Sequence, residues 1–493
     1  MERRQLLRLL ASAGAAPLLG SHGSSFAETA KPENWQADFV ASTARWKIGF
    51  ATPKVDMPLG RAAVRGRFPD AVAGTLFRVG RYRHWFDGDG MVHRFLIDGS
   101  QVHHQGRYVA TSKRVAELSA GRRLSEAFGT VPAGSSAPDS ADSMNVANIN
   151  VLPFQGEVLA LWEGGSATRI DARTLETLGL KTWRADLAGQ PFSAHPKVEP
   201  DGTVWNFGVA SRQGLLALYE IAPEGGMRRA GVVPVADLPS VHDFGVTQRH
   251  LVFLLPPLVF DVKRKEAGES FLDAHVWRPE LGMRVLVIDK RDWTRQQVLM
   301  LPVGFMFHVG NAWEEDTPGG TLIHIDYVRS NDASGVFTSA REVMRGRRVK
   351  VVEPHLTIAT LNLATGVATQ TVLPLDAEFP RIDPLRVGLR HRNVVHAAQG
   401  GREPPGFGAV AYTDIETGRS QCHNYGPGVI VEEHVFVPDD KSAGWILGTA
   451  LDFGRKKTML SCFAADQVAA GPIAQATLDY ALPLGLHGTF MPG

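Results

Sequence analysis

Cysteine is nearly absent from this sequence, which has only Cys422 and Cys462 among 493 residues. So few thiols exclude a disulfide framework and a metal site built from thiolates, and they leave open whether these two pair. An excess of charge of either sign is also lacking, because 52 Lys and Arg face 51 Asp and Glu, for a net charge of +1. This balance argues against a broad surface for nucleic acid, so no nucleic-acid partner is expected.

Long apolar runs are missing as well. Arg3 and Arg4 precede an apolar stretch of about a dozen residues that ends near Gly20, whereas a membrane-spanning helix needs about 20. The small residues around Phe26 then offer a cleavage site before residue 28. We therefore expect a twin-arginine-type signal peptide over residues 1–27, export to the periplasm, and a single domain over residues 28–493. An ordinary N-terminal helix is the alternative for the first residues.

Long helical periodicity is absent between residues 70 and 490, where short β-branched and aromatic runs alternate with Gly, Asp and Asn. A strand-and-turn signature recurs there at intervals of about 50 to 70 residues. Its copies are Arg169-Ile170-Asp171, Glu220-Ile221-Ala222, Val287-Ile288-Asp289, Thr360-Leu361-Asn362, Thr413-Asp414-Ile415 and Cys462-Phe463-Ala464. Such intervals are typical of four-stranded propeller blades stretched by insertions, and the residues before Arg169 would supply a further blade. We expect an all-β propeller with a total near seven blades; a β-sandwich with accidentally periodic turns is the alternative.

A histidine or glutamate follows each copy of the signature at a similar distance of about 17 to 25 residues. These residues are His195, His242, His308, Glu378, Glu433 and His487. The innermost strand of each blade runs along the central channel, so residues at one phase of successive blades converge on the axis. Buried polar groups are costly without partners, and a metal with its supporting residues accounts for such convergence. The sequence therefore predicts a metal site on the propeller axis.

The residue types indicate the kind of metal. Four imidazoles suit a divalent transition metal such as iron, zinc or copper, and they leave coordination positions open for O2 or substrate. A metal-bound histidine normally donates its second ring N–H to a carboxylate or carbonyl. Glu163, Glu378 and Glu433 are the candidates for that role, with solvated residues at strand ends as the alternative.

Nine ordered segments carry a family resemblance that covers about residues 60 to 490. They are Gly74–Gly80, His84–His93, Leu159–Gly165, Ala194–Lys197, His242–Phe244, Phe307–Glu315, Glu378–Asp383, Glu433–Pro438 and His487–Gly488. In these segments the chain resembles the carotenoid cleavage oxygenase family, which includes lignostilbene dioxygenases and the retinoid isomerohydrolase of the visual cycle. Nine segments in order are far more specific than any single one.

The resemblance implies a seven-bladed β-propeller with one Fe(II) per chain on its axis. The implied ligands are His195, His242, His308 and His487, with Glu163, Glu378 and Glu433 orienting His242, His308 and His487 respectively. It also implies a roof of loops and short helices, an apolar tunnel to the iron, and peripheral contact with a membrane. Aromatic candidates for the tunnel are Phe305, Phe307, Trp313 and Phe490, each of which fits the protein core equally well.

The activity implied is that of a non-haem Fe(II) dioxygenase that splits a conjugated C=C bond of a carotenoid or apocarotenoid with O2 into two carbonyl products. Such an enzyme positions its apolar substrate more than it moves protons, so no catalytic residue is expected beyond the metal centre. The alternative within the family is a hydroxystilbene substrate gripped by a Tyr and Lys pair, for which Tyr82 and Lys113 are candidates. A solvated basic loop is the other interpretation of Lys113. More distant alternatives are a non-catalytic propeller that binds ligands, a zinc esterase and an isomerase.

Overall fold

The computed structural model describes residues 43–51, 53, 55–82, 87–135, 138–335, 339–347, 353–402 and 405–493. The predicted signal peptide over residues 1–27 and the side chain of Tyr82 lie outside the described part. Among the residues that are described, no helix has the length and apolar character needed to cross a membrane.

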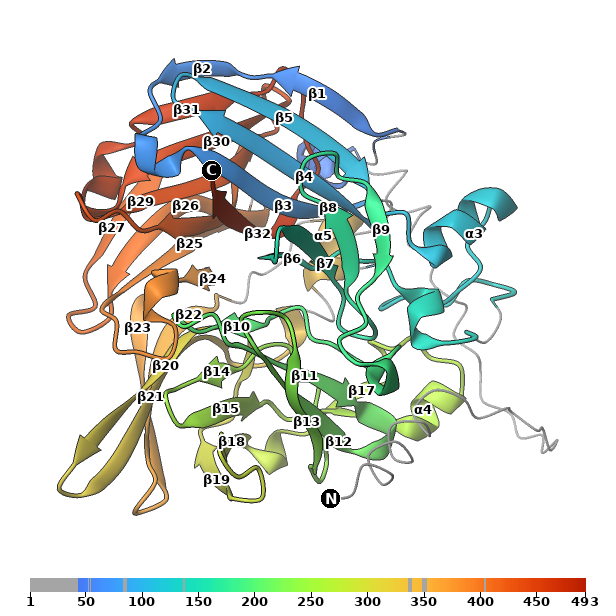
Figure 1. Cartoon of the computed structure of the whole chain (residues 1–493), viewed down its shortest axis with the longest axis vertical. Helices are drawn as coiled ribbons and strands as arrows, with labels where there is room; N and C mark the ends of the chain where they lie inside the picture. The colour runs from blue at the N-terminus through green and yellow to red at the C-terminus, as the bar shows by residue number, and fades with distance from the viewer. Residues whose placement is uncertain are drawn as a thin grey trace.

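Antiparallel sheets surround a central axis, and we number them as blades 1 to 7 in the described part of the chain (Figure 1). From the inside outward, blade 1 is β32 (Gly485–Pro492), β3 (Gly74–Tyr82), β4 (Asp89–Asp98), β5 (Gln101–Tyr108) and β1 (Met57–Arg61). Blade 2 is β6 (Asn150–Phe154), β7 (Glu157–Leu161), β8 (Thr168–Asp171) and β9 (Thr177–Leu180), and blade 3 is β10 (Lys197–Val198), β11 (Val204–Ala210), β12 (Leu215–Ile221) and β13 (Met227–Pro234). Blade 4 is β14 (Gly245–Val246), β15 (His250–Leu255), β18 (Met283–Asp289) and β19 (Gln296–Leu301).

The other three blades follow in chain order. Blade 5 is β20 (Phe305–Thr317), β21 (Gly320–Ser330), β22 (His355–Asn362) and β23 (Val367–Asp376). Blade 6 is β24 (Glu378–Arg381), β25 (Asn393–Arg402), β26 (Pro405–Asp414) and β27 (Ser420–Asn424). Blade 7 is β28 (Val429–Val437), β29 (Trp445–Asp452), β30 (Lys457–Ala464), β31 (Ala474–Thr477) and β2 (Ala63–Gly66), and the pairing of Phe407 with Val431 joins it to blade 6. The expected propeller is confirmed, and the β-sandwich alternative is wrong.

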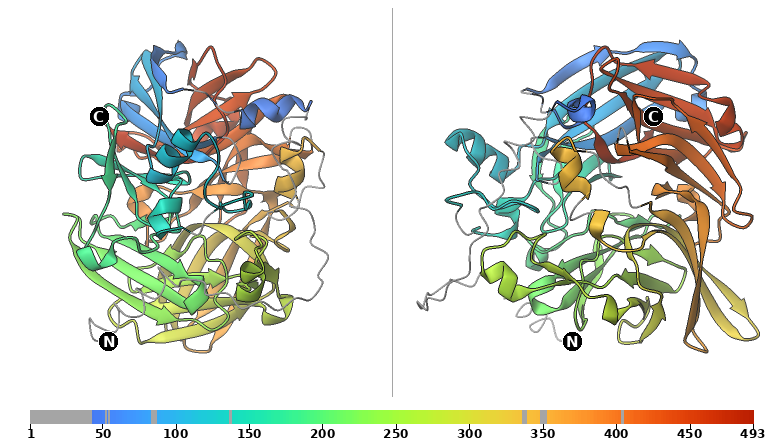
Figure 2. Two further views of the ribbon diagram at one scale, coloured as in Figure 1. Left: turned by 90° about the vertical axis from the view of Figure 1, so that its right-hand side faces the viewer. Right: turned by 180° about the vertical axis from the view of Figure 1, so that it is seen from behind.

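Both ends of the propeller domain contribute to closing the ring. The last strand, β32, pairs with β3 from Gly74↔Pro492 to Gly80↔Gly485. In return, β2 adds an outer strand to blade 7 by pairing with β31. Figures 1 and 2 show these blue N-terminal and red C-terminal strands side by side. Closing a ring by strand pairing leaves only short outer edges unpaired.

The signature triplets mark the same place in every blade, because each ends the third strand before the turn to the next strand outward. Blade 1 contains a seventh copy, Leu96-Ile97-Asp98, at the end of β4. The repeat spacing hides this copy, because the long connection between β5 and β6 interrupts it.

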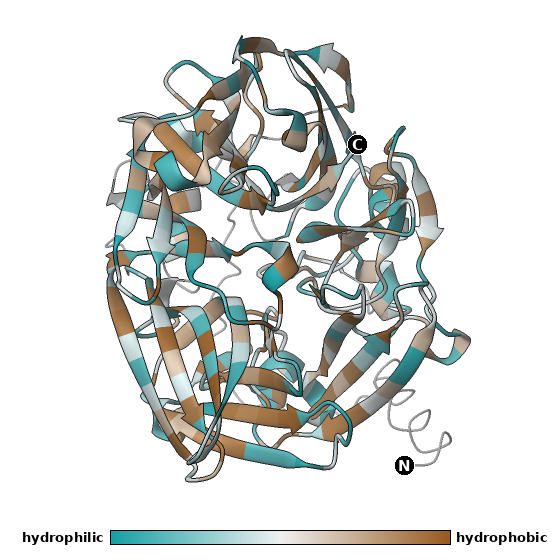
Figure 3. Ribbon diagram, turned by 60° about the vertical axis from the view of Figure 1, so that its left-hand side comes forward, coloured by the Kyte–Doolittle hydropathy of each residue, from teal (hydrophilic) through white to brown (hydrophobic). Residues whose placement is uncertain are grey.

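The core lies between neighbouring blades, since alternate residues of each strand face the next sheet. Hydrophobic and hydrophilic residues accordingly alternate along many strands (Figure 3). Between blades 4 and 5, for example, Val252 and Val285 pack in one buried cluster with Ile323 and Ile325. The two cysteines are free thiols, with Cys422 half-buried and Cys462 buried.

Three long connections carry the short helices. The connection between β5 and β6 contains α3 (Ser112–Ala120), and the one between β21 and β22 contains α5 (Ala340–Met344). The connection between β15 and β18 contains α4 (Val262–Glu266) and a hairpin of β16 (Leu258–Phe260) and β17 (His275–Trp277). The 3-10 helices among the described residues are η1 (Arg45–Phe50), η2 (Asp70–Val72), η3 (Ala141–Met144), η4 (Ala185–Leu187), η5 (Ser211–Gln213), η6 (Pro279–Leu281), η8 (Pro384–Arg386) and η9 (Ala465–Ala470). Phe128, Leu272 and Ala333, one from each long connection, share an apolar cluster with Phe305 and Phe307 of β20. This cluster, which we call the roof cluster, ties the long connections to an inner strand of the propeller.

Candidate metal centre

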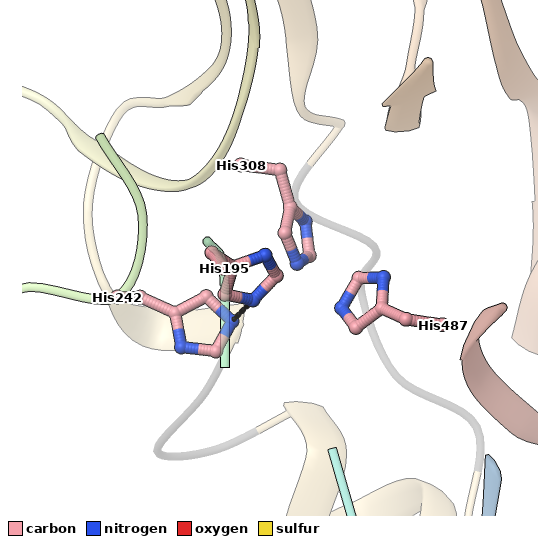
Figure 4. A group of neighbouring side chains, drawn as sticks. All are labelled: His195, His242, His308 and His487. Carbon is pink, nitrogen blue, oxygen red and sulfur yellow. Dashed lines mark hydrogen bonds between the residues drawn. The ribbon is translucent and has the colours of Figure 1, made fainter. Parts of the chain in front are cut away.

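Four histidines from four different blades meet on the axis (Figure 4). One ring nitrogen of each of His195, His242, His308 and His487 lies within 4.8 Å of the corresponding nitrogens of the other three. The Nε2 atoms of His195 and His242 are 3.0 Å apart. His195 and His242 precede the short strands β10 and β14, whereas His308 and His487 lie within β20 and β32.

Bulges in the inner strands aim several of these side chains at the axis. Between Met306 and Val309, β20 advances by three residues while β21 advances by two, so one extra residue is inserted beside His308. The same excess occurs at Glu378 in β24, at Glu433 in β28 and at His487 in β32. A bulge bends its strand and redirects a side chain, and bulges of this kind are frequent next to active sites.

Side-chain amides anchor the loop that carries His195. Asn206 Nδ2 donates to the carbonyl oxygen of Ser193 at 2.9 Å, and Asn150 Nδ2 donates to that of Ala194 at 2.8 Å. Asn150 belongs to β6, the inner strand of blade 2. Blade 2, which supplies none of the four histidines, therefore helps to position His195.

The three glutamates contact three of the four histidines. His308 Nδ1 lies 2.7 Å from Glu378 Oε2, and His487 Nδ1 lies 2.9 Å from Glu433 Oε1. Glu163, which follows β7, pairs through Oε1 with Nδ1 of His242. These contacts occupy Nδ1 and leave Nε2 of each ring facing the axis, the arrangement that orients a histidine toward a metal.

Burial is the largest influence on the acid–base properties of the site. It lowers the pKa of His195 well below its ordinary value, assisted by the neighbouring imidazoles, and lowers the pKa of His487 to about 4 although Glu433 opposes it. Burial also disfavours protonated His308, but contact with Glu378 outweighs it and raises the pKa of this histidine. Burial alone would raise the pKa of Glu433, yet a nearby arginine and His487 bring it to about 2. His195 and His487 are therefore neutral near pH 7, as metal binding requires.

The donor set fits a divalent transition metal. Two metal–nitrogen bonds of about 2 Å place adjacent ligand atoms about 3 Å apart and opposite ones about 4 Å apart. In the cluster, Nε2 of His195 and Nε2 of His242 are 3.0 Å apart, and all four ligand nitrogens lie within 4.8 Å of one another. Nε2 of His308 is buried and has no hydrogen-bond partner among the described residues, a state that a metal ion would relieve. Imidazole ligands bring no negative charge to the ion, and the three glutamates beside them supply it.

Aromatic side chains surround the histidines. The ring centroid of Phe307 lies 5.1 Å from that of His242, and Phe305 packs edge-on against Phe307. Phe379, which the sequence did not single out, lies 5.5 Å from His308 and 5.7 Å from His487 between ring centroids. Its φ of 57° is rare for a non-glycine residue, and such backbone is frequent at functional sites.

The other two aromatic candidates belong to the core. Trp313 packs in a buried cluster with Leu356 and Val394 of blades 5 and 6. Phe490 packs against the cluster between blades 7 and 1. Neither contacts the four histidines, so the sequence could not separate tunnel candidates from core.

Lys113 lies on α3. The side chain of Thr111 caps the start of this helix by accepting from the N–H of Arg114, and Gly121, with a φ of 64°, caps its end. Its side chain is buried, and Nζ lies 2.9 Å from Glu117 Oε2 and 3.5 Å from Asp89 Oδ1. The interpretation of Lys113 as part of a solvated loop is wrong. Its predicted partner Tyr82 has no described side chain, so the pair itself stays a prediction.

Comparison with known proteins decides which family has this site. Residues 51–492 match the RPE65 family, described as retinal pigment epithelial membrane protein. The chain belongs to the carotenoid cleavage oxygenase family. Apocarotenoid-15,15'-oxygenase of Synechocystis is 28% identical to this oxygenase, over 94% of the chain and 99% of the relative. The structure of cobalt-substituted Synechocystis apocarotenoid oxygenase matches with a TM-score of 0.81 and 27% identity, over 91% of this chain and 98% of that one.

Relatives with other named substrates match over similar lengths. Resveratrol cleavage oxygenase 1 of Aspergillus fumigatus is 26% identical, over 90% of this chain and 95% of the relative. Isoeugenol monooxygenase of Pseudomonas nitroreducens is 25% identical, over 90% of this chain and 97% of the relative. The chain is thus an oxygenase of a family that cleaves C=C bonds with O2, which sets aside the binding scaffold and the zinc esterase.

Proposed function

We propose that this oxygenase holds Fe(II) on the four histidines and cleaves one conjugated C=C bond of a carotenoid or apocarotenoid, with O2, into two carbonyl products. The observation that carries the proposal is the convergence of His195, His242, His308 and His487 on one point. When bound there, iron supplies open coordination positions at which O2 can react beside an electron-rich alkene.

The apolar surroundings of the histidines support a hydrophobic substrate. Phe307 contacts the ring of His242 and also belongs to the roof cluster, so apolar side chains continue from the metal centre into the roof. A site lined in this way favours a conjugated hydrocarbon over a polar molecule. The similarity to an apocarotenoid oxygenase over nearly the whole chain favours the same substrate class.

The residues of this chain hold and orient rather than transfer protons. Glu378 and Glu433 keep Nδ1 of their histidines engaged, so the rings present Nε2. Phe305 and Phe307 pack against each other beside the site and would limit the access of water, and the roof would place one double bond at the metal. Selectivity for one bond then depends on the shape of the roof.

The test is incubation of iron-loaded protein with a panel of carotenoids, apocarotenals and hydroxystilbenes, with products identified by mass. We expect two carbonyl products from a carotenoid or apocarotenal, strict dependence on O2, and one iron per chain. An anaerobic control of the same protein should give no product. A product with the carbon count of the substrate would indicate isomerisation and contradict the proposal.

Cleavage of a hydroxystilbene is the second candidate, favoured by the buried cation of Lys113 and by the resveratrol-cleaving relative. In this case Lys113 and Tyr82 would bind the phenol group of the substrate and help to deprotonate it. We expect Lys113→Met to abolish turnover of a hydroxystilbene and to remove the pH dependence that arises from the phenol. Unaltered turnover of stilbenes by this variant would exclude the second candidate.

We also propose that residues 1–27 direct the folded oxygenase to the periplasm and that the mature protein makes peripheral contact with a membrane. The Arg3-Arg4 pair supports the first part, and the apolar nature of the proposed substrate, which partitions into lipid, supports the second. Replacing Arg3 and Arg4 by Lys should leave the protein in the cytoplasm, as measured by cell fractionation. Periplasmic protein with both lysines in place would contradict the export proposal.

A further inference from the structure

His195 differs from the other three histidines in how its ring is supported. Each of the others has a glutamate oxygen against Nδ1. Among the described residues, the carboxylate nearest to Nδ1 of His195 is that of Asp243, whose Oδ2 is 4.0 Å away. This distance is too long for a hydrogen bond, so His195 must be positioned in another way.

Asp243 is buried and has partners on three sides. Its Oδ1 lies 2.8 Å from Lys197 Nζ and accepts from the N–H of Phe244 at 2.7 Å. Its Oδ2 accepts from the N–H of Val309 at 2.8 Å. A buried carboxylate with this many donors is held firmly, because removing any one would leave charge or a donor unpaired.

Asp243 and two of its partners, Lys197 and Val309, come from three successive blades, and each is close in sequence to a histidine of the cluster. Lys197 follows His195 by two residues in blade 3, Asp243 follows His242 directly at the start of blade 4, and Val309 follows His308 directly in blade 5. Val309 lies at the bulge of β20, which turns its N–H toward Asp243. One carboxylate therefore links the three segments that carry three of the four histidines.

We infer that the Lys197–Asp243 ion pair is a positioning element of the metal centre, setting the spacing of His195, His242 and His308. It replaces for His195 the carboxylate contact that the other rings have, by fixing the backbone that carries the ring instead of the ring itself. This inference rests on the four-histidine metal site of the proposed function.

The chain offers a matched control in a second ion pair between the same two blades. Lys290 Nζ lies 2.7 Å from Glu199 Oε1, and Lys290 is buried like Asp243. Lys290 follows β18 of blade 4, and Glu199 follows β10 of blade 3. Neither residue contacts any of the four histidines, so removing this pair tests the general effect of losing a link between blades.

The experiment uses the full chain freed of metal and titrated with Co²⁺ alone. Co²⁺ affinity is measured by competition with a chelator, and the visible absorption of bound Co²⁺ reports the arrangement of the imidazoles. We expect Lys197→Met and Asp243→Asn each to weaken Co²⁺ binding by about 10- to 100-fold and to change the spectrum. Lys290→Met should leave the spectrum unchanged, even where its thermal unfolding midpoint falls as far as that of Lys197→Met.

Two further variants test the pair as a unit. The double variant Lys197→Met/Asp243→Asn should bind Co²⁺ no more weakly than the worse single variant, since both changes break the same interaction. Lys197→Arg keeps the positive charge beside Asp243 and should restore most of the affinity and the original spectrum. If Asp243→Asn does not fold, the comparison of Lys197→Met with Lys197→Arg still tests the positioning role.

The outcomes separate this inference from the proposed function. If the unaltered protein binds Co²⁺ and Lys197→Met matches Lys290→Met in affinity and spectrum, the positioning role is overturned while the metal site stands. If the unaltered protein binds no Co²⁺, the metal site falls and the positioning role falls with it.

Discussion

Replacing Glu433 by Gln should lower both the affinity for metal and the stability of the metal-free protein, and the two effects can be measured separately. The carboxylate is buried, lies 2.9 Å from Nδ1 of His487 and accepts from the N–H of Gly488 at 2.7 Å. Gln has one acceptor oxygen in place of two, so its NH2 group must face one of these two donors. An unpaired buried donor costs about 1–3 kcal/mol, and loss of a residue that orients a metal ligand typically costs about 10- to 100-fold in affinity. By this reasoning metal binding weakens by about 1.4–2.8 kcal/mol.

The neighbouring Glu432 provides the control. It is equally buried but pairs with Arg78 at 2.9 Å and with Thr449, and it contacts none of the four histidines. Glu432→Gln should lower the unfolding midpoint of the metal-free protein about as much as Glu433→Gln. Only Glu433→Gln should change the dissociation constant for Co²⁺, measured by chelator competition. Equal losses of Co²⁺ affinity in the two variants would refute the reasoning, as would unchanged affinity in Glu433→Gln.

Three further predictions concern the fold and its response to metal and pH. Gly310→Ala should destabilise the protein by about 1–3 kcal/mol in urea unfolding, because the new Cβ would lie 1.9 Å from Asp326 Oδ2; an unchanged midpoint would contradict the packing of blade 5. Removal of metal by a chelator should lower the melting temperature. The free energy of unfolding lost is about 2.7 kcal/mol relative to protein in free metal at 100 times the dissociation constant. A melting temperature that does not depend on metal concentration would argue against binding. Burial raises the pKa of Glu314, but hydrogen bonds from His250 and Thr247 outweigh it and bring the pKa to about 2, below the ordinary value of 4.5. Its carboxylate therefore stabilises the fold above pH 4.5, and this stabilisation is lost as the pH falls toward 2. In a plot of the free energy of unfolding against pH, Glu314→Gln should reduce the fall in stability on the acid side. An unaltered fall would show that other groups cause it.

Much of the site could be predicted from the sequence, because a propeller repeats one local pattern. Each blade ends its third strand with a similar triplet, and after six of the seven triplets a histidine or glutamate of the next inner segment follows within about 17 to 25 residues. This spacing is enough to select His195, His242, His308 and His487 together with Glu378 and Glu433, since residues at a similar phase of successive blades converge on the axis. The assignment of each glutamate to its histidine came from the family resemblance, because spacing says nothing about which neighbouring blade a side chain faces.

The features that the sequence could not predict depend on long connections and on bulges. The copy of the signature at residues 96–98 is hidden because α3 and its flanking loops separate it from the next inner strand. Lys113 resembles a solvated loop residue in the sequence, yet α3 turns it against Glu117 and Asp89. Phe379 gave no sequence signal, because its place beside two histidines follows from a bulge and a left-handed backbone angle.

The sequence by itself determined the strand pattern, the number of repeats that could be counted and the residues that meet at the axis, since these follow from local hydrophobic alternation and spacing. Only the tertiary structure decided that β32 closes the ring against β3, that extra residues in the inner strands turn the side chains inward, and that Lys197, Asp243 and Val309 join three blades beside the histidines. The physical reason is that register, bulges and contacts between blades are set by hydrogen bonds between strands distant in sequence, and these form only when the sheets have packed around a common axis.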